Sequence, residues 1–224
     1  MVILVTGGCG YLGSCLIRNL PKHNEFEGET IRVFDNMFRD RYVALFDLPD
    51  SATYEMVIGD VRNRECIEKA MQDVTTVFAL SDVTNVSLSF DREHLTYETN
   101  YLGALNVFRA AVDNDVGKMV YTSTASVYGF TPDIVDETFD CRPMSPYGKY
   151  KLLAEQKMQK ESRETGFHWT ALRLGTVAGW SIGMRFDTVV NKFTMYASVG
   201  HPLTVWQSAL DETRPYVEIR DVMN

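Results

Sequence analysis

Residues 1–13 read Met-Val-Ile-Leu-Val-Thr-Gly-Gly-Cys-Gly-Tyr-Leu-Gly, a short apolar run followed directly by a cluster of glycines. The glycines fit two related patterns, G-x-G-x-x-G at Gly8, Gly10 and Gly13, and T-G-x-x-G-x-x-G from Thr6 to Gly13. The segment that follows repeats its apolar residues at helical spacing. A strand, a glycine turn and a helix in this order predict a dinucleotide site, because pyrophosphate must approach bare backbone N–H groups at a helix N-terminus.

The next apolar run, Ile31–Asp35, ends in a carboxylate 22 residues after Gly13. This is close to where the dinucleotide-binding fold offers an acid to the adenosine ribose. Asp35 would accept hydrogen bonds from both ribose hydroxyls and repel a 2'-phosphate, so we expect NAD rather than NADP as the cofactor. The alternative is that Asp35 and Asn36 only form a polar turn after a strand.

Apolar runs alternate with helical patterns along the whole chain. This alternation predicts the α/β class: a doubly wound, Rossmann-type parallel sheet with helices on both faces. The expected strands are residues 2–5, 31–34, 54–58, 76–80, 118–122 and 169–174. We expect an NAD-binding domain with the catalytic residues over 1–180 and a partial substrate-binding region over 181–224.

The composition limits the possible partners. A chain of 224 residues with 45% hydrophobic content can bury one substantial core. Its formal charge of −8 argues against affinity for nucleic acid or anionic membrane surfaces. No apolar run approaches the roughly 18 residues of a membrane span and no leader pattern precedes the first strand, so we expect a cytoplasmic protein.

The four cysteines show no C-x-x-C pair and no nearby histidine cluster, so we expect neither a metal site nor a disulfide framework. Cys9 lies inside the glycine loop. Either the helix N-terminus lowers the pKa of its thiol and makes it sensitive to oxidation, or it is a small residue that fits the turn.

Asp60 follows the third expected strand, in Gly59-Asp60-Val61-Arg62. In an open parallel sheet that end of a strand faces the ligand crevice, which places Asp60 to meet the adenine amino group. The alternative is that Asp60 caps the helical segment containing Glu65 and Ile67.

Residues 145–151, Ser-Pro-Tyr-Gly-Lys-Tyr-Lys, carry a Tyr-x-x-x-Lys pair at the start of a helical pattern. The spacing puts Tyr147 and Lys151 on one helical face. A lysine charge lowers the pKa of a neighbouring phenol, so that the phenol can take a proton from a substrate hydroxyl and return it. Thr124, in a cluster of hydroxyls after the fifth strand, could orient the same substrate oxygen. Taken singly, each feature also occurs by chance or as a turn or cap.

Together these motifs make the sequence similar to the extended short-chain dehydrogenase/reductase family, in particular the NAD-dependent nucleotide-sugar epimerase/dehydratase group typified by UDP-glucose 4-epimerase. The resemblance extends through essentially the whole chain. It rests on residues 6–13, Asp35, Asp60-Val61, Asn100 in Asn-Tyr-Leu-Gly-Ala-Leu-Asn-Val, and residues 123–129, 145–151, 172–173 and 214–222.

The resemblance implies a homodimer that binds NAD and a nucleoside-diphosphate sugar, with dimer helices near residues 95–112 and 147–161. The implied catalytic residues are Thr124, Tyr147 and Lys151. The implied cofactor-binding residues are Gly7, Gly10, Tyr11, Leu12, Gly13, Asp35, Asn36, Asp60, Val61, Leu80, Asn100, Tyr147 and Lys151. The implied substrate-binding residues are Thr124, Ser126, Thr176, Arg185, Asn191 and Arg214, and no metal is expected.

Several positions depart from the family pattern. Dehydratases of this group place Asp-Glu after the catalytic hydroxyl, whereas Ala125-Ser126 follows Thr124, which disfavours 4,6-dehydration. Thr176 stands where many epimerases have asparagine, and Phe78-Ala79-Leu80-Ser81 replaces the usual His-Leu-Ala-Ala. Family members usually continue well beyond Asp221, so the C-terminal substrate lobe is expected to be small and truncated.

For residues near Asn191 the alternative to a substrate role is an ordinary amphipathic helix, with Val189, Val190, Phe193 and Tyr196 as its core face. Three functions remain open for the chain. It could be an NAD-dependent epimerase that removes and returns hydride, a dehydrogenase or reductase of a sugar or other secondary alcohol, or a non-catalytic NAD-binding module.

Overall fold

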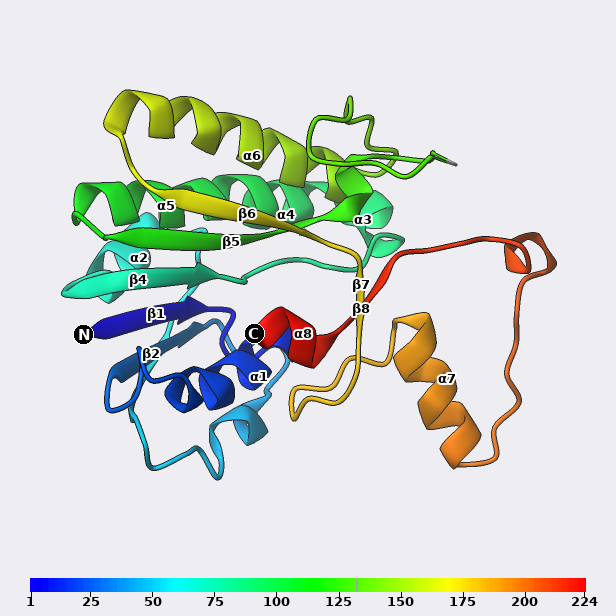
Figure 1. The fold of residues 1–224 in the computed structure, drawn as a ribbon, viewed down its shortest axis with the longest axis horizontal. Helices are drawn as coiled ribbons and strands as arrows, with labels where there is room; N and C mark the ends of the chain where they lie inside the picture. The colour runs from blue at the N-terminus through cyan, green and yellow to red at the C-terminus, as the bar shows by residue number, and fades with distance from the viewer. Residues whose placement is uncertain (132) are drawn as a thin grey trace.

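The computed structural model describes residues 1–131 and 133–224 (Figure 1). Six strands form one sheet in the order β3-β2-β1-β4-β5-β6, and every neighbouring pair is parallel. Their bounds are β1 Val2–Thr6, β2 Thr30–Asp35, β3 Thr53–Ile58, β4 Val74–Ala79, β5 Lys118–Thr124 and β6 Trp169–Leu174. All six expected strands are confirmed. The central strand β1 is a buried apolar run because both faces of a parallel sheet are covered, whereas the edge strands β3 and β6 contain exposed residues.

Helices lie on both sides of this sheet, as expected for a doubly wound fold (Figure 1). On one face, α2 (Arg64–Ala70), α5 (Ala104–Asp113) and α6 (Pro146–Thr165) share a core with Leu4 and Met119. On the other face, α1 (Tyr11–Asn19) covers a second core that includes Ile3 and Val33. The short helix α8 (Ile219–Met223) packs back beside α1.

Short helical segments complete the domain. The 3-10 turns are Leu20–Lys22, Tyr42–Leu45, Ala125–Val127 and Gln207–Ala209, and the short α-helices are α3 Leu88–Asp91 and α4 Glu93–Tyr97. A π-helix, Glu98–Gly103, leads directly into α5. Within the described residues, no helix is both long and apolar enough to cross a membrane.

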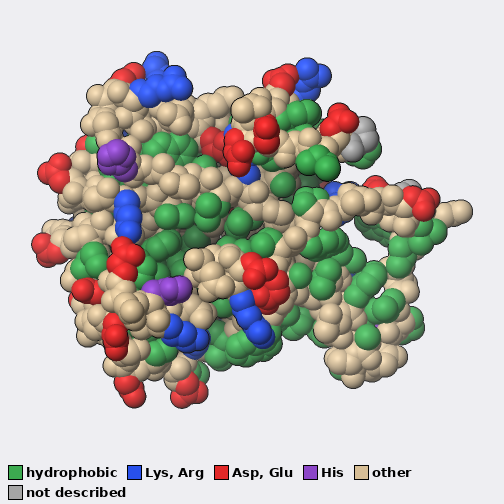
Figure 2. Space-filling view, viewed as in Figure 1, with side chains coloured by type: hydrophobic (Ala, Val, Ile, Leu, Met, Phe, Trp, Pro, Cys, Tyr) green, Lys and Arg blue, Asp and Glu red, His purple; other side chains and the backbone are tan. Residues whose placement is uncertain are grey.

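Beyond β6 the chain leaves the main sheet. Strands β7 (Thr176–Ala178) and β8 (Tyr216–Glu218) pair in parallel as a separate small sheet, and α7 (Val189–Ser198) projects away from the domain (Figure 1). Hydrophobic side chains remain visible on this part of the surface (Figure 2). The largest exposed ones here are Trp180, Phe186, Val199, Leu203, Val205, Trp206 and Leu210.

The helix expected near Asn191 is confirmed as α7, but the expected core face is wrong for two of its four residues. Val189 and Val190 are 42% and 40% exposed, whereas Phe193 and Tyr196 are half-buried and Asn191 is buried. Asn191 can be buried because its amide is hydrogen-bonded to protein groups. Val189 and Val190 remain exposed because α7 projects from the main sheet (Figure 1).

Candidate active site

All six strands point the same way, so their carboxyl ends meet at one edge of the sheet. The loop after β1 lies where β1 separates β2 from β4, the position at which an open α/β sheet forms its ligand crevice. The loop hydrogen-bonds to both neighbours. Gly7 N donates to Phe34 O over 2.7 Å, and Leu80 N donates to Thr6 O over 3.1 Å. The chain order of the sheet therefore brings the glycine loop to the crevice.

The glycines of this loop are required by close backbone contacts. Gly7 has φ +68°, and a Cβ there would lie 2.9 Å from the backbone of Leu80. A Cβ on Gly13 would lie 2.2 Å from the carbonyl oxygen of Gly7. Gly10 caps α1, so the first N–H groups of Tyr11 and Leu12 face the open end of the helix. This is a backbone cradle of the kind that binds a phosphate.

Asp35 is fixed beside the cradle at the end of β2. Its Oδ2 accepts a hydrogen bond from Cys9 N over 3.0 Å, and its Oδ1 accepts one from Met37 N over 2.9 Å. The carboxylate thus forms the polar turn that was the alternative interpretation. Each of its oxygens keeps a second lone pair for a ribose hydroxyl, so the two roles are compatible.

Cys9 is not a reactive thiol. It is 2% exposed, and burial together with the nearby charge of Asp35 raises the pKa of its thiol to about 12. The hypothesis that this pKa is lowered is wrong, because burial and Asp35 raise it and Arg18 only partly opposes them. Cys9 is a small residue that fits the turn. All four cysteines are free, and the described part of the chain holds no cluster of potential metal ligands.

Asp60 lies beyond β3 in a charged turn. Burial opposes its ionisation, but hydrogen bonds from Arg62 and Asn36 outweigh burial and hold its pKa at about 2. The alternative that Asp60 caps the next helix is wrong, because the side chain of Asn63 accepts from Cys66 N at the start of α2. The side chain of Val61 is buried in the core, and its carbonyl oxygen accepts a hydrogen bond from the amide of Asn106 over 2.9 Å.

The expected catalytic residues converge at the same edge. Ser145 caps α6 by accepting from Gly148 N over 3.2 Å, and Pro146 opens the helix, so Tyr147 enters the site from the first turn. Thr124 ends β5, and its hydroxyl acts on the phenol of Tyr147 and lowers the phenol's pKa. Lys151 follows one helical turn later and is fully buried.

The electrostatics of Tyr147 differ from the expectation. Burial raises the pKa of its phenol, the charge of Asp82 raises it further, and Thr124 and Arg185 only partly oppose them. Lys151 is not among the groups that lower this pKa, which differs from the prediction, and its charge is paired with Asp82. Its Nζ lies 2.8 and 2.6 Å from the two carboxylate oxygens of Asp82.

Asp82 is the group that the sequence reasoning missed. The signal was an acid directly after the altered segment Phe78–Ser81, at the carboxyl end of β4. Asn100 holds this segment: its amide donates to Val83 O over 3.0 Å and accepts from Val83 N over 2.8 Å. Asn100 lies in the π-helix, a local widening that is common at functional sites.

The expected substrate residues occupy different places. Ser126 follows Thr124 directly, its N–H bonded to the threonine hydroxyl. Arg185 donates to Thr84 O over 3.2 Å and pairs with Asp187, and its charge acts on Tyr147 and Asp82. Thr176 lies in β7.

Asn191 and Arg214 are engaged with protein groups. The amide of Asn191 bonds Gly179 N, Arg185 O and the Tyr11 hydroxyl. Tyr11 in turn donates to Gly179 O over 2.8 Å, which ties the C-terminal segment to the start of α1. Arg214 is exposed and pairs with Glu212.

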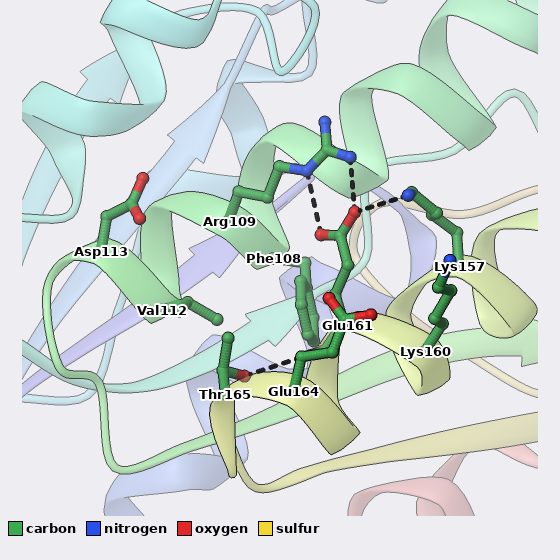
Figure 3. Close-up of a pocket in the computed structure, with 9 residues that line it drawn as sticks. All are labelled: Phe108, Arg109, Val112, Asp113, Lys157, Lys160, Glu161, Glu164 and Thr165. Carbon is green, nitrogen blue, oxygen red and sulfur yellow. Dashed lines mark hydrogen bonds and ion pairs between the residues drawn. The ribbon is translucent and has the colours of Figure 1, made fainter.

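A shallow pocket lies elsewhere, between α5 and α6 (Figure 3). Arg109 of α5 pairs with Glu161 of α6 across it, and Lys157 pairs with Glu161 within α6. It sits near the C-terminal ends of these helices, and a helix that returns between parallel strands ends at the sheet edge opposite the strands' carboxyl ends. This pocket therefore does not belong to the catalytic group.

The chain is similar to known proteins in sequence and in structure. The sequence profile of the NAD-dependent epimerase/dehydratase family matches residues 3–224. A UDP-glucose 4-epimerase of Lactobacillus helveticus is 29% identical over 184 residues, which are 81% of this chain and 53% of that protein. The UDP-glucose 4-epimerase of Thermus thermophilus, solved in complex with NAD, superposes with a TM-score of 0.83 at 28% identity, covering 100% of this chain and 72% of its own.

The corresponding Thermotoga maritima enzyme, solved with UDP-glucose, gives a TM-score of 0.84 at 27% identity, covering 100% of this chain and 71% of its own. The chain thus spans about half the length of the curated relatives it matches.

Proposed function

The chain belongs to the NAD-dependent epimerase/dehydratase family, and on that premise we propose that it is an NAD-dependent epimerase of a nucleoside-diphosphate sugar. The observation that carries the proposal is the convergence of Thr124, Tyr147 and Lys151 at the edge of the sheet that also holds the glycine cradle. Ala125 and Ser126 stand where dehydratases carry acids, which favours epimerisation over dehydration.

The residues of the crevice fit the cofactor. In residues 7–13 the positions of Gly7 and Gly13 have no room for a side chain, and the stretch presents N–H groups for a pyrophosphate. Asp35 has free lone pairs for the adenosine ribose, while Asn36, Asp60, Val61, Leu80 and Asn100 frame the remaining length of the crevice. We propose that Lys151 faces the second ribose. When bound, NAD supplies a reversible hydride acceptor.

The chain's own groups handle the proton. Thr124 orients the sugar hydroxyl, and the Tyr147 oxygen takes the proton from that hydroxyl as its carbon is oxidised, then gives it back when the carbon is reduced. The low exposure of Tyr147 and Lys151 keeps water from the reacting carbon. If the keto-sugar rotates in the site between the two steps, hydride returns to the other face of the ketone. The configuration at that carbon is then inverted.

We assign the substrate's remaining contacts to residues 181–224 and to Ser126 and Thr176, with Arg185 nearest the reacting group and Asn191 and Arg214 further out. Residues 1–180 then form the NAD-binding domain. We also propose a homodimer through the helices of residues 95–112 and 147–161, whose exposed surface includes the pocket of Figure 3.

One observation favours a second candidate, a dehydrogenase or reductase. Burial and Asp82 raise the pKa of Tyr147, so the phenol carries its proton at neutral pH, the form that the reduction of a ketone needs. In that case hydride does not return, and the protein consumes or releases NADH in proportion to product.

The proposal is tested by proton NMR of UDP-, dTDP-, GDP- and CDP-sugars incubated with the purified protein and catalytic NAD. We expect the anomeric signals of one sugar to convert to those of its epimer without stoichiometric NADH, and Tyr147→Phe to abolish the conversion. Stoichiometric NADH would support the dehydrogenase instead. Tight NAD binding with no sugar converted would indicate a non-catalytic NAD-binding module.

A further inference from the structure

A buried polar network adjoins Thr124 and Tyr147 and joins three segments of the chain. We call it the Glu155 network, and its members are Ser123, Tyr128, Glu155 and Arg173. Ser123 and Glu155 are 4% and 7% exposed, and the side chain of Arg173 is 20% exposed. Polar groups are costly to bury unless they are paired, so the arrangement of these side chains is specific.

Glu155 is the centre of the network. It lies eight residues after Tyr147 on α6, and its spacing from Lys151 places it on the same side of the helix. Its Oε2 accepts hydrogen bonds from Nη2 and Nε of Arg173 over 2.7 and 3.1 Å. Its Oε1 accepts from the hydroxyl of Ser123. Both carboxylate oxygens are thus engaged by protein donors, which makes Glu155 a structural partner of the site rather than a group that contacts substrate.

Ser123 connects the network to the chain before Thr124. It is the residue before Thr124 on β5, so its hydrogen bond to Glu155 ties the carboxyl end of this strand to α6. Arg173 pairs with Ser123 in the register of β5 and β6, and its guanidinium reaches the same carboxylate from the neighbouring strand. One carboxylate therefore joins α6 to the ends of two strands.

Tyr128 connects the network to the chain after Thr124. The residues that follow Thr124 form the 3-10 turn Ala125–Val127, and Tyr128 ends this turn by donating its N–H to Ala125 O over 3.1 Å. The phenol oxygen of Tyr128 accepts a hydrogen bond from Arg173 Nη1 over 3.2 Å. The guanidinium also lies 5.0 Å from the ring centroid of Tyr128. The chain is therefore held to the network on both sides of Thr124.

The first turn of α6 packs closely against the same 3-10 turn. A Cβ on Gly148 would lie 2.7 Å from the carbonyl oxygen of Ser126, so glycine is needed for the two backbones to approach this closely. Tyr147 is the residue before Gly148. A movement of the 3-10 turn relative to α6 would therefore change the distance between the hydroxyls of Thr124 and Tyr147.

We propose that the Glu155 network positions Thr124 against Tyr147 for the transfer of the sugar's proton. The inference rests on the proposed function, because it takes Thr124 to orient the sugar hydroxyl and Tyr147 to remove its proton. A displacement of about 1 Å in such a site can cost about 10²-fold in rate. Loosening the network should slow the proton transfer and leave the binding of NAD intact, because the glycine cradle lies at the end of β1.

The activity test removes single hydroxyls from the full chain. Ser123→Ala breaks the link to the end of β5 and leaves the Glu155–Arg173 ion pair, while Tyr128→Phe breaks the link to the 3-10 turn and leaves the ring beside the guanidinium. We measure kcat and KM for the sugar that the wild type converts. We expect kcat to fall about tenfold in each variant and about a hundredfold when both are combined, with KM and the Kd of NAD within about twofold.

Glu161→Gln is the matched control. It removes a carboxylate from the other end of α6, where two N–H groups of Arg109 bond it. It should lower the free energy of unfolding and leave kcat unchanged, because this ion pair does not touch the chain around Thr124. Urea denaturation establishes that each variant is folded. If the combined variant does not fold, the two single variants are judged by the same measures.

Hydrogen exchange followed by mass spectrometry tests the network without sugar or NAD. In the combined variant, peptides over residues 123–129 and 145–151 should exchange at least about threefold faster than in the wild type, because the contact that holds them together is weakened. Peptides over residues 2–6 of β1 should exchange as before. Glu161→Gln should leave all three regions unchanged.

The proposal is overturned if the folded variants keep wild-type exchange over residues 123–129 and 145–151, or if their kcat falls no further than that of Glu161→Gln. A wild type that converts no sugar contradicts the epimerase assignment alone. The exchange rates then still decide whether the Glu155 network holds the two segments together. An active wild type whose variants keep both kcat and exchange contradicts only the positioning role.

Discussion

Substituting Gly13 by alanine tests whether the glycine loop is built for a phosphate. The added Cβ would lie 2.2 Å from the carbonyl oxygen of Gly7, 2.6 Å from the Cα of Gly8 and 2.8 Å from its carbonyl carbon. All three atoms belong to the backbone, so no side chain can rotate away. The closest contact is about 1.2 Å short of the 3.4 Å at which ordinary contact begins, so helix α1 must move away from the end of β1 by a similar amount.

The size of the effect follows from this displacement. Overpacking of a tight interior contact costs about 1–3 kcal/mol, and we expect a loss of that size in the free energy of unfolding. The same movement separates the first N–H groups of α1 from the Gly7 backbone. A phosphate can then no longer contact both the helix N–H groups and Gly7. We expect NAD affinity to fall at least about tenfold, which corresponds to a loss of about 1.4 kcal/mol of binding free energy.

The assay combines urea denaturation with NAD titration by calorimetry. Gly166→Ala is the matched control, because Gly166 has φ +74° at the end of α6 and nothing lies within 4 Å of its added Cβ. It should lose about 1 kcal/mol of stability through backbone strain alone and keep wild-type NAD affinity.

The reasoning is refuted if Gly13→Ala is as stable as the wild type and binds NAD within twofold of it. It is also refuted if Gly166→Ala loses as much NAD affinity as Gly13→Ala. The latter result would mean that general loss of stability, not the geometry of the loop, controls binding.

Three further predictions concern the crevice. Tyr147→Phe removes only the transferable proton, so turnover should fall by a factor of at least about 10² while calorimetry finds NAD affinity within twofold; appreciable residual turnover would exclude Tyr147 as the acid/base group. Asp35→Ala should weaken NAD and reduce discrimination against NADP, and an unchanged ratio of the two affinities would remove Asp35 from the ribose site. Asp60 has a pKa of about 2 against 3.8 when unperturbed, so it contributes roughly 2 kcal/mol to the free energy of unfolding. This contribution is complete above pH about 5 and is lost as pH falls toward 2. Urea denaturation at several pH values should show the loss in the wild type and not in Asp60→Asn. The prediction is wrong if the free energies of unfolding of the two proteins change with pH in the same way.

Much of the fold could be predicted from local pattern. The strands were recognisable because a parallel sheet buries both faces of its inner strands, which makes them mainly apolar runs. Gly13 was recognisable because a tight turn excludes side chains. The Tyr147–Lys151 pair could be placed on one face of a helix by spacing alone. These signals are local, because each depends only on residues that are close together in the sequence.

The errors concern residues whose surroundings come from distant segments. Cys9 lies at a helix N-terminus, yet burial beside Asp35 decides its pKa. Asn63 rather than Asp60 caps α2, because Arg62 and Asn36 already bind the carboxylate. In α7 the buried side chain is the polar Asn191, because Tyr11, far away in sequence, supplies its partner.

The sequence by itself determined the apolar runs that form the strands, the glycine cradle and the Tyr147–Lys151 pair proposed as the acid/base group, because periodicity, turn chemistry and i,i+4 spacing are properties of neighbouring residues. Only the tertiary structure decided the charge state of that group. Asp82 and Lys151 are 69 residues apart and meet because β4 and α6 end at the same edge of the sheet. Burial and charge pairing depend on such distant contacts, so the ionisation of Tyr147 is a property of the folded crevice rather than of the Tyr-x-x-x-Lys motif.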